Sequence, residues 1–99
     1  MLSTIPINLQ CVKKDDMDKE ILRAGIIAEL DAINLYEQMA DMTEDQGLRT
    51  LLLDVAKEEK THVGEFQVLL LAKDGEQEGE LKEGRKEVEA LFKKMTETP

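Results

Sequence analysis

The 99-residue chain is short of several residue types, and each shortage excludes a class of protein. A single cysteine excludes an intrachain disulfide, so the interior of a cell is the expected compartment. One tyrosine, two phenylalanines and no tryptophan leave no stacking platform for nucleic-acid bases. No apolar run approaches the length of about 20 residues that crosses a bilayer. Residues 1–10 also lack the basic start and apolar stretch of a secretory signal.

Basic residues are in deficit as well, because 13 Lys and Arg stand against 22 Asp and Glu, for a net charge of −9. This balance argues against nucleic acid and against a membrane as partners, and it favours a protein that attracts cations. A chain of this length makes one small domain at most. A helical core of this size is commonly stabilised by oligomerisation.

Hydrophobic spacing predicts an all-α chain with two long helices and a shorter C-terminal one. The first helix is expected over about residues 15–42, where a cluster of acidic residues favours a helix start, and the second over about residues 48–71. Spacings of three and four alternate along one seam of each helix, which is typical of helices packed against partners. The first seam is Leu22, Ile26, Glu29, Ile33, Tyr36 and Ala40, and the second is Leu48, Leu52, Val55, Glu59, His62, Phe66 and Leu69.

The pattern divides the chain into an irregular arm over residues 1–14, a helical hairpin over residues 15–73 and a C-terminal helical segment over residues 74–99. The arm shows no clear periodicity, and its Cys11 is interpreted as a free thiol without a role.

Turn residues predict where the helices meet. Thr43 is predicted to cap the second helix, with Gln46 three residues later completing a capping box. Asp74 and Gly75 are predicted to end that helix, because a glycine is expected just past a helix end. Two further glycines weaken the start of the last segment, so a helix is expected there only from about Arg85.

Three seam positions break the apolar pattern, and all three carry good metal ligands. Glu29 interrupts the first seam, and Glu59 and His62, one turn apart, interrupt the second. The short connection predicts an antiparallel hairpin. Because Glu29 and Glu59 lie the same 15 residues on either side of Glu44, they are expected at the same height, with His62 one turn beyond. Unpaired charges on a core seam cost several kcal/mol, so a divalent metal is the expected partner.

One hairpin supplies half of a carboxylate-bridged two-metal site. Ferritin-like bundles use one Glu from each of two helices and a Glu-x-x-His from each of the other two. This chain has only one His, so its Glu-x-x-His occurs once. A two-fold dimer would restore the four-helix bundle and the full ligand set together. Mixed carboxylate and imidazole ligands favour iron, manganese or zinc, and reaction with O2 favours iron.

Plainer interpretations stand beside this one. A histidine in an apolar seam is often a satisfied core residue, and Glu59 alone can set the register between helices. Tyr36, two turns from Glu29, is either a core aromatic or a redox-active neighbour of the metals. Glu58, Glu65 and Asp31 flank the seams and are interpreted as surface charges.

The ordered motifs also resemble a known family, the encapsulated ferritins, over about residues 16–71. The resemblance rests on Glu29-Leu30-Asp31-Ala32-Ile33-Asn34-Leu35-Tyr36, on Leu48-Arg49-x-x-Leu52 and on Glu58-Glu59-Lys60-Thr61-His62. It implies a two-helix protomer that dimerises around a di-iron ferroxidase centre, with the dimers arranged in a ring. Glu29, Glu59 and His62 would be the iron ligands and Tyr36 their catalytic neighbour.

The same resemblance implies a cytoplasmic ferroxidase enclosed in an encapsulin shell, with Fe(II) and O2 as substrates and the oxidised iron stored in the shell. Some members carry an acid just before the first Glu and a Trp just before the Tyr, where this chain has Ala28 and Leu35, so Asp31 is the main remnant of their outer metal site. No shell-targeting tail is recognised after Met95. Other members are fused to the shell protein.

Two other functions are compatible with the pattern. A metal-free helical hairpin that dimerises as an interaction module would tolerate leucine at Glu59 and His62. A related di-metal peroxidase of the rubrerythrin kind, or a manganese catalase, would use the same ligands, although rubrerythrin-like chains usually carry additional iron–sulfur ligands.

Overall fold

The computed structural model describes residues 8, 10 and 13–97 and is helical almost throughout. A short 3-10 turn, η2 (Lys14–Asp16), precedes three α-helices: α1 (Met17–Met42), α2 (Gln46–Lys73) and α3 (Gly75–Thr96). The predicted all-α fold, with a shorter helix after a hairpin, is confirmed. The expected arm lies mostly outside the described residues, as does Cys11. No helix in the described part of the chain is both long and apolar enough to cross a bilayer.

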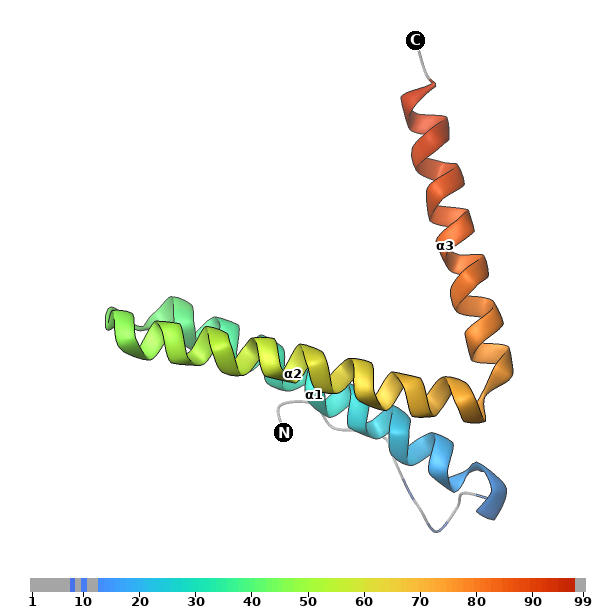
Figure 1. Ribbon diagram of the computed structural model, residues 1–99, viewed down its shortest axis with the longest axis horizontal. Helices are drawn as coiled ribbons and strands as arrows, with labels where there is room; N and C mark the ends of the chain where they lie inside the picture. The colour runs from blue at the N-terminus through green and yellow to red at the C-terminus, as the bar shows by residue number, and fades with distance from the viewer. Residues whose placement is uncertain (1–7, 9, 11–12, 98–99) are drawn as a thin grey trace.

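Helices α1 and α2 lie side by side and run antiparallel (Figure 1). The best-buried apolar side chains lie between them: Leu22, Ile33 and Ala40 from α1, and Ala56 and Leu70 from α2. Gly25 faces the ring of Phe66, and a Cβ atom there would lie 3.4 Å from three ring carbons. The missing side chain therefore leaves the room that the aromatic ring fills.

The turn between α1 and α2 is capped by Asp45. Its Oδ2 accepts a hydrogen bond of 2.8 Å from the backbone N–H of Leu48, as an N-cap carboxylate does. The predicted cap at Thr43 is wrong, because the Thr43 N–H still donates to the Met39 carbonyl and so ends α1. Arg49 closes the turn by donating to the carbonyls of Ala40, at 3.1 Å, and Thr43, at 2.7 Å.

A single residue, Asp74, separates α2 from α3. α2 ends at Lys73, as predicted, but Gly75 does not cap it: Gly75 is the first residue of α3, and no glycine in the described residues has a positive φ. The predicted start of the last helix near Arg85 is wrong. The Asp74 carboxylate caps the Gln77 N–H at 3.1 Å, and this starts α3 ten residues earlier than expected despite its glycines. From Asp74, α3 projects away from the hairpin (Figure 1).

One apolar face of the hairpin has no partner among the described residues. On α1 the predicted seam is correct at Leu22, Ile33 and Ala40, which are buried. On α2 the buried residues are instead Ala56 and Leu70, each one position beyond a seam residue. Three leucines at or beside the α2 seam are about half exposed: Leu48 45%, Leu51 58% and Leu69 56%. The α2 seam therefore lies at the edge of the hairpin contact and is left with an exposed apolar surface.

Candidate metal centre

Glu29 from the middle of α1 meets Glu59 and His62 from α2. Nδ1 of His62 lies 3.4 Å from Oε2 of Glu59 and 3.4 Å from Oε2 of Glu29. One ligand atom from each residue can be chosen so that all three lie within 4.8 Å of one another. The two helices thus bring together residues that are 30 positions apart in the sequence, from Glu29 to Glu59.

The two carboxylates of this group are largely shielded from solvent. The side chains of Glu29 and Glu59 are each 18% exposed, whereas that of His62 is 44% exposed. Oε2 of Glu29 is buried and, among the described residues, has no hydrogen-bond partner. The nearby imidazole nitrogen of His62 is within ion-pair distance but is not hydrogen-bonded to it; its one hydrogen-bonding contact in the group is with Glu59.

A buried carboxylate oxygen without a partner is costly, because its desolvation is not offset by a hydrogen bond. Two carboxylates and an imidazole converging on one point would offset that cost by binding a cation. This donor set fits iron, manganese or zinc better than magnesium or calcium. Three protein ligands also leave coordination positions for a further ligand or substrate.

A hollow of about 380 Å³ adjoins the group. Glu29 and His62 form one part of its lining, and Glu65, Phe66 and Leu69 of α2 form the rest. The sequence placed Glu65 on the surface, and it is indeed exposed, but it also borders this hollow. In the sequence, only its position one turn after His62 indicated that Glu65 lies near the site. This indication is weak, because acidic residues are frequent throughout the chain.

Tyr36 is half-buried on α1, seven residues beyond Glu29. That separation corresponds to roughly 10 Å along the helix axis, and Tyr36 is not among the residues that line the hollow. Glu58 is exposed on α2 and Asp31 is half-buried on α1, and neither belongs to the converging group.

The comparisons with known proteins agree on one family. The EncFtn-like family matches residues 8–83. A ferritin-like–encapsulin shell fusion protein from Pyrococcus furiosus is 67% identical over 72 residues, which is 73% of this chain. The encapsulin nanocompartment cargo protein EncC from Myxococcus xanthus is 40% identical over 62 residues, which is 63% of this chain. The chain spans only 21% of the first relative and 48% of the second.

The crystal structure of the encapsulated ferritin domain from Pyrococcus furiosus superposes with a TM-score of 0.79 at 57% sequence identity. The match covers 92% of this chain and 95% of that domain. It therefore includes the projecting third helix as well as the hairpin.

Proposed function

The chain belongs to the EncFtn-like family, and from this premise we propose that it is a ferroxidase domain that oxidises Fe(II) with O2. The observation that carries the proposal is the buried Oε2 of Glu29, which has no hydrogen-bond partner among the described residues and lies 3.4 Å from Nδ1 of His62. We propose that Glu29, Glu59 and His62 bind a cation together, because a cation would give this oxygen of Glu29 the partner that the described residues do not supply.

The group holds half of the ligands that a two-metal site needs. A second copy of the chain, related by a two-fold axis, would bring another Glu29, Glu59 and His62 to the same place. The partly exposed leucines of α2, Leu48, Leu51 and Leu69, give that copy an apolar surface to cover. We therefore propose that dimer formation and completion of the site are one event, which produces a ferritin-like four-helix bundle. Rings of such dimers are a further expectation from the family.

The chemistry follows from placing two Fe(II) substrates side by side. Each Fe(II) gives up one electron, so a neighbouring pair delivers two electrons to O2. The carboxylates of Glu29 and Glu59 hold the substrate and favour the more highly charged Fe(III) product. The imidazole of His62 binds when it is neutral, since only then does Nδ1 or Nε2 offer a lone pair. We propose Tyr36 as a catalytic neighbour whose approach to the metals depends on the partner subunit.

The names of the relatives support a place inside a shell. One relative is a fusion to an encapsulin shell protein and the other is an encapsulin cargo protein. We propose that this domain likewise acts within an encapsulin nanocompartment in the cytoplasm, as part of a fusion or as separate cargo. The shell would then hold the oxidised iron.

The test combines assembly and turnover. Anaerobic protein is titrated with Fe(II) and examined by analytical ultracentrifugation, then exposed to O2 while Fe(III) absorbance and O2 consumption are followed. The expected result is iron-promoted dimers or assemblies of dimers and O2-dependent oxidation. A stable monomer that binds iron with full affinity would overturn the shared site. Rapid turnover of hydrogen peroxide without Fe(II) oxidation would instead favour the peroxidase or catalase alternative.

A further inference from the structure

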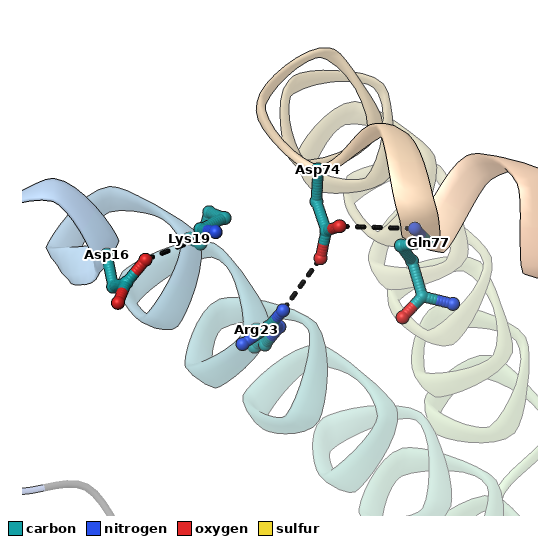
Figure 2. A network of polar contacts seen from close by, with 5 residues as sticks. All are labelled: Asp16, Lys19, Arg23, Asp74 and Gln77. Carbon is teal, nitrogen blue, oxygen red and sulfur yellow. Dashed lines mark hydrogen bonds and ion pairs between the residues drawn. The ribbon is translucent and has the colours of Figure 1, made fainter.

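The joint between α2 and α3 consists of one residue that bonds in several directions. The Asp74 N–H donates to the Leu70 carbonyl and ends α2, and the Asp74 carbonyl accepts from the Glu78 N–H at the start of α3. Its side chain bridges two helices: Oδ1 accepts from the Gln77 N–H of α3 at 3.1 Å, and Oδ2 accepts from Nη2 of Arg23 on α1 at 2.7 Å. Figure 2 shows the carboxylate lying between these two donors.

The rest of α3 has little support from the hairpin. None of its residues is buried. An open hollow lies between the two helices at the joint, lined by Gln67 and Leu71 on α2 and by Leu81 and Arg85 among the residues of α3. Because few side chains pack between α2 and α3 at the joint, the direction of α3 depends mainly on the bonds made at Asp74.

We propose that Arg23 and Asp74 form a latch that fixes the direction of α3 relative to the hairpin. One rigid carboxylate is bonded to the first turn of α3 through one oxygen and to α1 through the other, so rotation of α3 about the joint breaks the bond to Arg23. The latch therefore sets where α3 presents its exposed apolar stripe, which consists of Leu81, Val88, Leu91, Phe92 and Met95. Neither residue belongs to the candidate metal centre, so this inference does not depend on the proposed ferroxidase activity.

The two lysines near the joint pair with other carboxylates, whereas Arg23 pairs with Asp74. Lys19 pairs with Asp16 at 3.2 Å, and Lys73 pairs with Asp18 at 3.6 Å (Figure 2 shows the first of these pairs). The Asp74 side chain is only 14% exposed, compared with 71% for Asp18. A short charge-assisted bond to a shielded carboxylate is stronger and more directional than a longer pair at the surface.

The test follows the direction of α3 through a distance between two labels, one on α2 and one on α3. Spin labels are placed at Lys57→Cys on α2 and Lys93→Cys on α3, both exposed positions, in a Cys11→Ser background. Labelled protein is assembled with a large excess of unlabelled protein of the same sequence, so that distances within one chain dominate the pulsed electron resonance signal. Arg23→Gln removes the latch, and Lys73→Gln is the matched control, because it removes one positive charge from the same end of the hairpin.

The unsubstituted protein is expected to give one narrow distance distribution, and Arg23→Gln is expected to broaden it about twofold. Asp74→Asn, which keeps an oxygen for the Gln77 N–H but loses the charge, should broaden it similarly. Arg23→Lys should restore part of the narrowing. Circular dichroism verifies that the helices persist in each variant. The latch is overturned if Arg23→Gln gives the same distance distribution as Lys73→Gln. It is also overturned if the distance distribution of the unsubstituted protein is already broad.

Discussion

At the scale of single residues, Glu29 is the clearest case of a charged side chain whose burial costs stability. Its buried Oε2 has no hydrogen bond within the part of the chain that the structure describes, and such a group costs about 1–3 kcal/mol, or more when it is charged. An apolar side chain at this seam position would avoid that cost. The sequence revealed Glu29, Glu59 and His62 because each interrupts an apolar seam. It could not reveal which oxygen lacks a partner or that Glu65 borders the hollow, since both depend on side-chain rotamers.

The first prediction is that His62→Ala and Glu59→Ala each abolish binding of paired metals while the helices remain formed. Each substitution removes a ligand and also a polar group from a partly shielded seam, so stability without metal should stay equal or rise by about 1 kcal/mol. Metal content after equilibration with Fe(II), and thermal unfolding with a chelator present, measure the two effects. Thr61→Ala is the control, because Thr61 is exposed on the same turn. Fe(II) oxidation at the parent rate in either variant would refute the ligand assignment.

At the scale of elements, the helices were predictable but their ends were not. Seams of three and four residues gave α1 and α2 to within about two residues, because amphipathic periodicity is a repeated signal. A helix cap depends on a single residue, and several residues that could serve as the cap lie close together in the sequence. Thr43 and Asp45 are both good caps, and the choice is made by the Thr43 N–H, which remains bonded within α1. Asp74 likewise overrides the signal of Gly75 by capping the next helix.

The second prediction tests the corrected cap. Asp45→Ala should lower the free energy of unfolding by about 1 kcal/mol, because the Leu48 N–H loses its acceptor. Thr43→Ala removes only a hydroxyl that accepts from the Asp45 N–H at an exposed position, so its effect should be smaller. Urea unfolding followed by circular dichroism gives both values. A larger loss for Thr43→Ala than for Asp45→Ala would show that the cap has been assigned to the wrong residue.

The third prediction concerns the pH dependence of the joint. The Gln77 N–H, and after it the Arg23 guanidinium, hold the pKa of the Asp74 carboxyl below its ordinary value of 3.8. Because the folded pKa is below the unfolded one, the carboxylate contributes its full stabilisation above pH 3.8 and loses it as the pH falls through the folded pKa. The joint should therefore be insensitive to pH near neutrality. Carboxyl carbon shifts in an NMR titration measure the Asp74 pKa, and in Arg23→Gln it should move upward. A midpoint for Asp74 at or above its ordinary value would contradict this.

At the scale of the whole molecule, the chain carries half of the proposed metal site and an exposed apolar surface, and the sequence indicated these features only in part. Its single His predicted half a metal site, and its single pair of long helices predicted half a core. The half-exposed leucines of α2 and the projecting α3 agree with a chain that assembles with other copies. The direction of α3 was beyond sequence reasoning, because it depends on contacts between Arg23 and Asp74, 51 residues apart. A net charge of −9 attracts cations, among which Fe(II) is the proposed substrate.

The last prediction is that the isolated domain oxidises iron but does not retain it. A hairpin dimer fills its core with side chains and bound metal, and a ring of dimers stays open to solvent, so neither provides a closed space for a mineral. The ferric product should therefore leave the site and precipitate, whereas a surrounding shell would collect it. Because attraction of Fe(II) by the negative surface is screened by salt, the oxidation rate at low Fe(II) should fall as ionic strength rises. Loading the isolated domain with excess Fe(II) in air, then measuring turbidity and soluble iron per subunit, tests both points. Many irons held in solution per subunit would show that the domain stores iron without a shell, and an oxidation rate that does not respond to salt would remove the role assigned to its charge.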